Sequence, residues 1–207
     1  VGPDGGTHQA IEDIALMRII PNMCVISPVD SIQAKLATIA CATTPTPTYL
    51  RLAREKTPII TTNKTPFEIG KANKLFSSSK VKNEVAIIAT GALVFNALKV
   101  AKKCEEEGIG VIVVNLSTIK PLDKKTILEV AKETGAVVTV EEHQIAGGMG
   151  SAVSEFLSQT FPVPMEFIGV NDVFGQSGKP QQLIEHYGMG EKDIYNAIHN
   201  ILRRKHD

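Results

Sequence analysis

The chain has 207 residues, of which 43% are hydrophobic and 21% are charged. These values are ordinary for a globular protein with a substantial buried core. Lys and Arg together number 22, as do Asp and Glu, so the formal net charge is zero. This balance argues against nucleic acid or an anionic membrane surface as a partner.

The sequence is typical of a cytoplasmic protein. Cys24, Cys41 and Cys104 are widely spaced and form neither a CxxC pair nor a metal-ligand cluster, so we expect reduced structural thiols. No apolar run approaches the roughly 20 residues of a membrane span, and no charged-then-apolar leader is present. The chain opens on a turn-rich segment without a starting Met, and we therefore expect the trailing part of a larger enzyme.

Hydrophobic spacing predicts alternating helices and strands in the first quarter of the chain. Helices are expected over residues 11–20 and 31–43, the second with Ile32, Leu36, Ile39 and Ala40 on one apolar face. Strands are expected over residues 23–27 and 49–53. The alternation favours a parallel sheet.

A second α/β unit is predicted after an irregular connection over residues 55–83, which holds one short extended piece. We place a domain boundary near residue 80. The strands expected beyond it are 84–89, 110–115, 136–140 and 164–170, and the helices are 92–107, 123–134, 151–160, 181–187 and 191–204. Gly108 and Gly135 follow helices at positions that favour a left-handed residue.

The first motif with chemical potential is Asp-Gly-Gly-Thr-His-Gln at residues 4–9. Its glycines permit a tight turn, and Asp4 and His8 stand at a helix entrance. Exposed helix amides and an imidazole favour anionic or polyhydroxylated ligands. The alternative is a helix cap with a solvated His.

The second motif is Tyr-Leu-Arg-Leu-Ala-Arg-Glu at residues 49–55. An Arg just past the carboxyl end of a parallel strand lies where such folds place ligands, and a guanidinium can bind phosphate through two parallel hydrogen bonds. A surface Arg paired with Glu55 is the alternative.

The third motif places Glu141, Glu142 and His143 before Gly-Gly-Met-Gly-Ser at residues 147–151. Carboxylates and His together are compatible with metal binding or acid–base chemistry, and the glycines with an anion or regulatory site. However, the glycine run lacks both the P-loop Lys and the dinucleotide fingerprint. We therefore favour a structural or inter-domain role. A fourth polar segment, 169–180, is expected to be a loop before a helix that opens with Pro180.

Together these segments resemble the transketolase family of thiamine-diphosphate enzymes, in particular its C-terminal half, including the split form on two polypeptides. The resemblance is carried, in the family's order, by G-P-D-G-G-T-H-Q-A-I-E-D-I-A-L-M-R-I-I-P-N-M (2–23), S-P-V-D (27–30), Y-L-R-L-A-R-E (49–55), S-T-I-K-P-L-D (117–123), V-E-E-H-x-x-x-G-G-M-G-S-A-V (140–153) and F-G-x-S-G-K-P (174–180). The segments extend over nearly the whole chain, and as a set they are highly specific.

The resemblance implies the fold class and the domain organisation. Residues 1–62 would be the latter half of a parallel-sheet pyrimidine-binding domain, residues 63–83 a linker, and residues 84–207 the transketolase C-terminal domain. That domain is expected to be a three-layer α/β/α unit with a mixed sheet.

The resemblance also implies substrate-binding roles for three residues. Asp4 would contact a hydroxyl of the ketose donor, His8 the substrate end next to the thiazolium adduct, and Arg54 the sugar phosphate. These roles suit a carboxylate, an imidazole and a guanidinium. Gly6 stands where the family commonly has Pro, a departure that leaves Asp4 and His8 in register.

The implied activity is transfer of a two-carbon ketol unit between sugar phosphates, in the pentose phosphate pathway. The Glu and the aromatic residues that hold the cofactor's pyrimidine ring in the family do not occur in this sequence, nor does the domain that binds its diphosphate and Mg²⁺. We therefore assign no catalytic or metal-binding residue to the chain, and expect thiamine diphosphate and Mg²⁺ to belong to the complete enzyme. Alone, the chain should be inactive.

The expected partners are sugar phosphates, an N-terminal transketolase subunit or segment, and a second copy in a homodimer. Other interpretations stay open. They are part of a deoxyxylulose-phosphate synthase, part of a 2-oxoacid dehydrogenase β-subunit, or a non-catalytic assembly and dimerisation module. Residues 11–13 and the Ser-Gly-Lys-Pro at 177–180 favour transketolase over the synthase, and Asp4 with Arg54 suits a sugar phosphate better than an acyl substrate.

Overall fold

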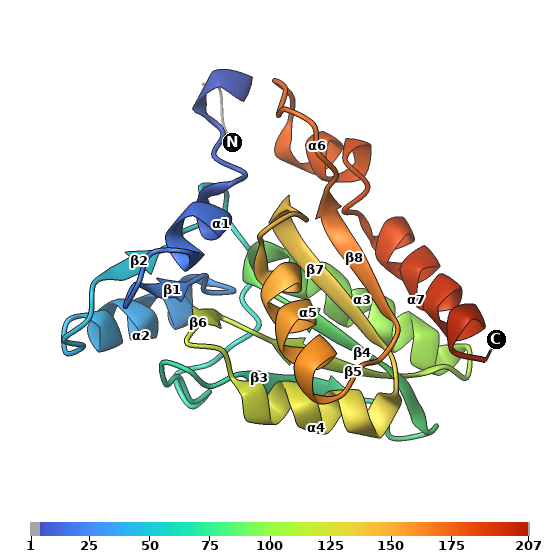
Figure 1. The fold of residues 1–207 in the computed structure, drawn as a ribbon. Helices are drawn as coiled ribbons and strands as arrows, with labels where there is room; N and C mark the ends of the chain where they lie inside the picture. The colour runs from blue at the N-terminus through green and yellow to red at the C-terminus, as the bar shows by residue number, and fades with distance from the viewer. Residues whose placement is uncertain (1–4, 207) are drawn as a thin grey trace.

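Two β-sheets lie next to each other in the computed structural model, which describes residues 5–206 (Figure 1). The smaller sheet has the strand order β2-β1-β6. Strand β1 (Cys24–Ile26) pairs in parallel with β2 (Thr48–Leu50) and antiparallel with β6 (Thr118–Lys120). The sequence did not predict β6, because its three residues are too few to show a period.

Helices flank the smaller sheet on its two faces. Alternate residues of β1 point in opposite directions, as strand geometry requires. Val25 shares a buried cluster with Ile14 of α1 (Asp13–Arg18), whereas Ile26 shares another with Ala37 of α2 (Ser31–Cys41). The strand–helix alternation predicted for this part of the chain is therefore confirmed.

The apolar face predicted for α2 is only partly buried, because Ile32, Leu36 and Ala40 are half-buried and the fully buried residues lie beside them. Ile39 is 57% exposed, whereas Gln33 and Ala37 are buried. The Gln33 side chain accepts a hydrogen bond from the Val29 N–H at 2.9 Å and one from Asn115 Nδ2 at 3.1 Å. These buried polar contacts orient the helix, because a buried amide must be hydrogen-bonded.

The larger sheet has five strands in the order β3-β5-β4-β7-β8. All neighbouring strands are parallel except β3, which pairs antiparallel with β5. The bounds are β3 (Asn73–Ser77), β4 (Asn83–Ala89), β5 (Gly110–Asn115), β7 (Val137–Gln144) and β8 (Met165–Val170). Strand β3 lies inside the segment expected to be a linker; the domain limits at residues 62 and 84 stay a prediction.

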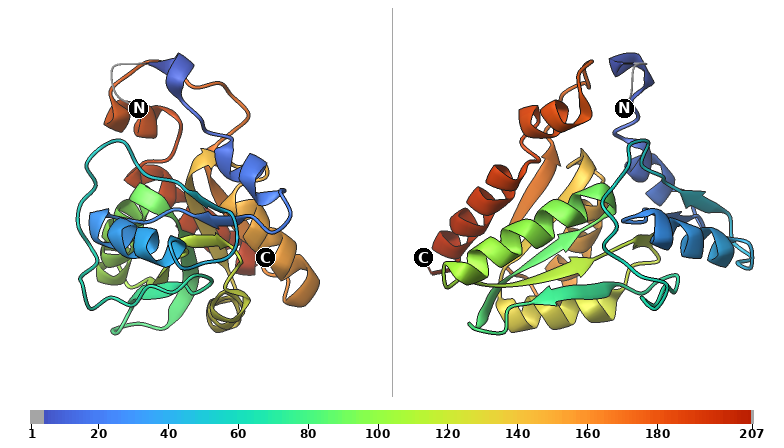
Figure 2. Two further views of the ribbon diagram at one scale, coloured as in Figure 1. Left: turned by 90° about the vertical axis from the view of Figure 1, so that its left-hand side faces the viewer. Right: turned by 180° about the vertical axis from the view of Figure 1, so that it is seen from behind.

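Helices cover both faces of this sheet and produce the expected three-layer α/β/α arrangement with a mixed sheet. The helices α4 (Lys124–Thr134) and α5 (Met149–Thr160) lie on the face seen in Figure 1. The helices α3 (Val94–Glu106) and α7 (Glu191–His206) lie on the opposite face, seen from behind in Figure 2. Short elements complete the chain: η1 (Gly6–His8), η2 (Gly91–Leu93) and α6 (Pro180–His186).

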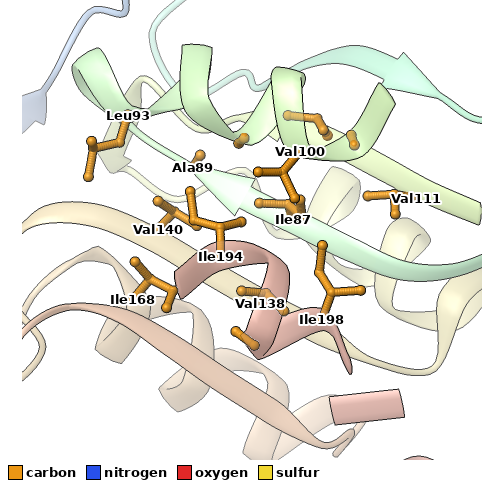
Figure 3. Close-up of a cluster of buried hydrophobic side chains, with 14 of the residues drawn as sticks. Ile87, Ala89, Leu93, Val100, Val111, Val138, Val140, Ile168, Ile194 and Ile198 are labelled. Carbon is orange, nitrogen blue, oxygen red and sulfur yellow. The ribbon is translucent and has the colours of Figure 1, made fainter. Parts of the chain in front are cut away.

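The core consists of aliphatic side chains that alternate between the two faces of the central strand. Ile87 of β4 points toward α3 and α7. It shares a buried cluster with Val138 of β7, Val100 of α3 and Ile194 of α7 (Figure 3). Ile88, the next residue, belongs to the cluster on the other face. Both are fully buried, which explains why the strand appears as a continuous apolar run in the sequence.

The two sheets share part of their hydrophobic core. One cluster joins Ile14 and Val25 of the N-terminal part to Leu116 and Met149 of the larger unit. Lys120 adds polar contacts, since its Nζ donates hydrogen bonds to the carbonyl oxygens at the end of α1. The N-terminal part therefore packs firmly on the larger unit.

The cysteines Cys24, Cys41 and Cys104 are all unpaired, as expected. Burial raises the pKa of the Cys104 thiol to about 11, which suits a structural residue. Among the helices of the described residues, none is long and apolar enough to cross a membrane.

Candidate functional site

A cleft of about 600 Å³ lies between the N-terminal part of the chain and one end of the larger unit. His8 and residues 49–58 line one side, and residues from η2, α3 and α6 line the other. The predicted site residues His8 and Arg54 thus line the same cavity, although they are far apart in the sequence. Asp4 lies outside the described residues.

His8 is carried by a segment that packs against the loop before α6. The Gly6 N–H donates a hydrogen bond to Ser177 Oγ at 3.1 Å, and Gln9 Nε2 donates one to the Gln176 carbonyl at 2.9 Å. Gly5 has φ +76°, and a Cβ built on it would lie 2.4 Å from Ser177 Oγ. Glycine is therefore favoured here by its positive φ, and a side chain would in addition displace the Ser177 hydroxyl that accepts the Gly6 hydrogen bond.

This packing explains two of the sequence motifs together. The polar loop over residues 169–180, expected only to be a connection, is the surface on which the Gly-Gly-Thr-His-Gln segment rests (Figure 1). The ring of His8 is exposed, and its Nδ1 lies 3.0 Å from Thr7 Oγ1. The segment thus presents an imidazole at the edge of the cleft.

Arg54 lies on the cleft wall that follows β2, together with Glu55 and Lys56. The strand ends at Leu50, earlier than the predicted residue 53, and the chain then continues without regular structure. This position past the carboxyl end of a parallel strand is the one in which α/β folds bind ligands. A guanidinium on this wall can bind a phosphate from the cleft.

Arg51, the first Arg of the same motif, forms hydrogen bonds with other residues of the chain. Its Nε donates a hydrogen bond to Asp13 Oδ2 at 2.8 Å, and its Nη2 donates one to the Glu142 carbonyl at 2.9 Å. Tyr49 donates its hydroxyl to the same Asp13 oxygen at 2.7 Å. Burial and this hydrogen bond raise the pKa of Tyr49 to about 12, so it stays a donor.

Glu141 caps the helix α5. Its carboxylate accepts hydrogen bonds from the Met149 N–H at 2.7 Å and the Gly150 N–H at 2.8 Å. A Cβ on Gly148 would lie 2.4 Å from Glu141 Oε2, which explains the glycine at this position. The glycine-rich run therefore accommodates a carboxylate of the chain itself, at the helix end where a phosphate would otherwise bind.

Glu141 and His143 are both buried, and their environments shift their pKa values. Burial raises the pKa of Glu141 to about 7, although the two N–H donors favour the ionised form. Burial lowers the pKa of His143. The imidazole accepts a hydrogen bond from the Ala15 N–H at 3.3 Å through Nε2, so Nδ1 carries the proton and donates to the Gln144 carbonyl at 2.6 Å.

These contacts favour the structural interpretation of the Glu-Glu-His motif. Glu141 accepts a hydrogen bond from the start of α5, and the Glu142 carbonyl accepts one from Arg51. His143 accepts one from the N-terminal end of α1. Within residues 5–206, no group of three or more His, Cys, Asp and Glu side chains could hold a metal ion. The motif joins the two parts of the chain.

Asp30 is a structural residue that the sequence interpretation missed. Its carboxylate accepts hydrogen bonds from the Gln33 N–H at 2.9 Å and the Thr61 N–H at 2.7 Å. Burial alone would raise the pKa of Asp30, but these and further hydrogen bonds hold it below the ordinary value. The signal was available, because Asp followed three residues later by Gln resembles a capping box.

Comparison with known proteins identifies two matching family models. The transketolase pyrimidine-binding domain matches residues 1–59, and the transketolase C-terminal domain matches residues 73–194. The second match covers more than half of the chain.

Individual relatives agree with these models. A 6-deoxy-6-sulfo-D-fructose transketolase subunit from Clostridium sp. (strain MSTE9) is 40% identical over 98% of this chain and 62% of its own length. A putative transketolase C-terminal section from Methanocaldococcus jannaschii is 40% identical over 99% of this chain and 64% of its own length. The chain thus spans less than two thirds of these relatives.

A solved structure described as a split gene transketolase, inactive beta4 tetramer, has the same fold. It superposes with a TM-score of 0.90 at 42% sequence identity, covering 97% of this chain and 64% of that one.

Proposed function

Because the chain belongs to the transketolase family, we propose that it forms the C-terminal part of an enzyme that transfers a two-carbon ketol unit between sugar phosphates. The observation that carries this proposal is the shared cleft of His8 and Arg54. A volume of about 600 Å³ is within the usual range for sites that hold a small-molecule ligand.

The two residues have complementary tasks in this proposal. Arg54 binds the phosphate group, because a guanidinium offers a planar pair of donors that matches phosphate oxygens. His8 hydrogen-bonds to oxygen atoms near the reacting end of the sugar, since imidazole both donates and accepts. Asp4, four residues before His8, is proposed to accept a hydrogen bond from a donor hydroxyl.

Thiamine diphosphate with Mg²⁺ is the proposed cofactor of the complete enzyme. When bound, it supplies the nucleophilic carbon that carries the two-carbon unit. The residues of the cleft are suited to sugar hydroxyls and phosphate, whereas no three-residue metal-ligand group occurs in the part of the chain that the structure describes. We therefore propose that another polypeptide or segment holds the diphosphate and the metal.

Because another polypeptide or segment is proposed to hold the diphosphate and the metal, the chain needs a partner. We propose an N-terminal transketolase subunit or segment as that partner, a homodimeric arrangement of the C-terminal part, and a cytoplasmic enzyme of the pentose phosphate pathway. Support comes from a relative in Phocaeicola vulgatus that is named as one subunit of an apulose-4-phosphate transketolase. It is 36% identical over 93% of this chain and 61% of its own length.

The test is reconstitution of ketol transfer. The chain is assayed alone and with an N-terminal transketolase polypeptide, using xylulose 5-phosphate and ribose 5-phosphate with thiamine diphosphate and Mg²⁺. We expect no measurable transfer by the chain alone and transfer by the mixture. Transfer by the chain alone contradicts the need for a partner. Complex formation without any transfer supports the assembly module instead.

Arg54→Met tests the phosphate assignment. Loss of a charged hydrogen-bond donor removes about 1.5–3 kcal/mol of binding, which corresponds to a rise in KM of about 10- to 100-fold. The matched control is Arg203→Met on α7, where the guanidinium donates to Asn200 Oδ1 at 2.6 Å and does not line the cleft. Equal KM values for both variants would show that Arg54 does not bind the phosphate.

A further inference from the structure

We propose that Arg51 is a positioning residue for the sugar-phosphate site, a role that rests on the function proposed above. Arg51 ties the wall that carries Arg54 to the segment that carries His8 and to the end of β7 in the larger unit. It thereby gives the C-terminal domain a part in shaping the substrate site.

The contacts of Arg51 connect four separate elements. Its backbone N–H donates to the Ile26 carbonyl at 2.8 Å, which holds it at the end of β2. The side chain donates to Asp13 at the start of α1, to the Glu142 carbonyl in β7 and, at 3.5 Å, to the Ala10 carbonyl. The backbone of Arg51 thus joins the end of β2 to β1, and its guanidinium joins this point to α1, β7 and the N-terminal segment.

The position of this junction links it to the cleft. Arg51 and Asp13 both line the cavity that contains His8 and Arg54. Ala10, one of the acceptors, is two residues from His8, and Arg54 is three residues beyond Arg51. The Gln144 N–H also donates to the Ile11 carbonyl at 2.7 Å, so the His8 segment is attached to β7 at a second point.

Only a guanidinium can make this set of contacts. Its rigid fork directs several N–H groups to acceptors in different directions, whereas a lysine ammonium is a single point charge. The pair is largely shielded from water, since the Arg51 and Asp13 side chains are 20% and 10% exposed. Replacement of Arg51 therefore leaves a largely buried Asp13 carboxylate without its cationic partner, while the Tyr49 hydroxyl still donates to it.

Arg18 provides a matched control. It also extends from the N-terminal part to the larger unit, donating to the Gly147 carbonyl at 2.7 Å and to Glu155 at 2.8 Å. Unlike Arg51, it is not among the residues that line the cleft. If Arg51 only held the two parts of the chain together, Arg51→Met and Arg18→Met would have the same consequences.

The kinetic test uses the enzyme assembled with its N-terminal transketolase polypeptide. We expect Arg51→Met to raise KM for ribose 5-phosphate by on the order of tenfold, because a small misplacement of binding groups is costly. Arg18→Met should stay within about twofold of wild type, the scatter expected away from the site. Equal KM values in the two variants would overturn the proposal.

A second readout does not depend on activity. The ¹H–¹³C signal of the His8 ring, assigned through His8→Gln, should shift in Arg51→Met and remain in place in Arg18→Met. An unchanged His8 signal in Arg51→Met overturns the positioning role even if the assembled enzyme is inactive. An inactive wild-type enzyme with a shifted His8 signal refutes the proposed function and leaves the positioning role supported.

Discussion

Glu141→Gln should change how the stability of the protein depends on pH. Glu141 is buried with 1% exposure and caps α5, and burial raises its pKa from 4.5 to about 7. Because this pKa is raised in the folded state, the group contributes stability that is fully present below pH 4.5. That contribution is lost as the pH rises through about 7.

The magnitude follows from the two pKa values. They differ by 7 − 4.5, or about 2.5, and each pH unit is worth about 1.4 kcal/mol. The wild-type protein should therefore lose about 3 kcal/mol from this group across the window, most of it between pH 5 and 7. Gln does not ionise, so position 141 adds no pH dependence to the stability of the variant; relative to the protonated Glu141, one unmade hydrogen bond to the helix end costs about 1–3 kcal/mol.

Urea denaturation at pH 5, 6, 7 and 8 measures this difference. His143 opposes Glu141, because its lowered pKa means that stability is lost as the pH falls below 6.5. His143 Nδ1 lies 3.9 Å from Glu141 Oε2, so the difference between the unfolding free energies of wild type and variant reports Glu141 together with its effect on His143. It should shrink by about 2–3 kcal/mol from pH 5 to pH 8.

Glu142→Gln is the control for this experiment, because it removes the same charge from the adjacent residue. A difference between wild type and Glu141→Gln that stays constant from pH 5 to pH 8 would falsify the assignment of a raised pKa to Glu141. So would a change in slope of the same size in the control.

Two further predictions concern packing. Gly110→Ala should destabilise the protein by more than about 3 kcal/mol, because a Cβ would lie 1.9 Å from the Lys82 carbonyl oxygen; a melting temperature within about two degrees of wild type would contradict this. Ile88→Ala in the buried central strand should cost about 2–5 kcal/mol, whereas Ile39→Ala, at 57% exposure, should cost under about 0.5 kcal/mol in the same denaturation assay. Equal losses for the two isoleucines would show that Ile39 is covered in solution.

Sequence periodicity predicted the alternation of strands and helices in the larger unit, whereas its three-layer arrangement was implied by the resemblance to a family. Its strands are continuous apolar runs because both faces of the sheet are covered, and its helices end at glycines such as Gly108 and Gly135, which have φ of +84° and +69°. These signals are local, since a few neighbouring residues decide them. The short strand β6 and the exposure of Ile39 on α2 were missed because pairing and burial there depend on residues distant in the chain.

The candidate site was determined by the tertiary structure. Residue types and their resemblance to a family identified His8 and Arg54, but only the folded chain brings both to one cleft. Arg51 and Arg54 are the same residue type, and both line that cleft. Arg51 acquires its positioning role because the Asp13 carboxylate and the Glu142 carbonyl lie within hydrogen-bonding distance of its guanidinium. These acceptors lie 38 and 91 residues from Arg51 in the sequence, a separation that no local pattern can encode.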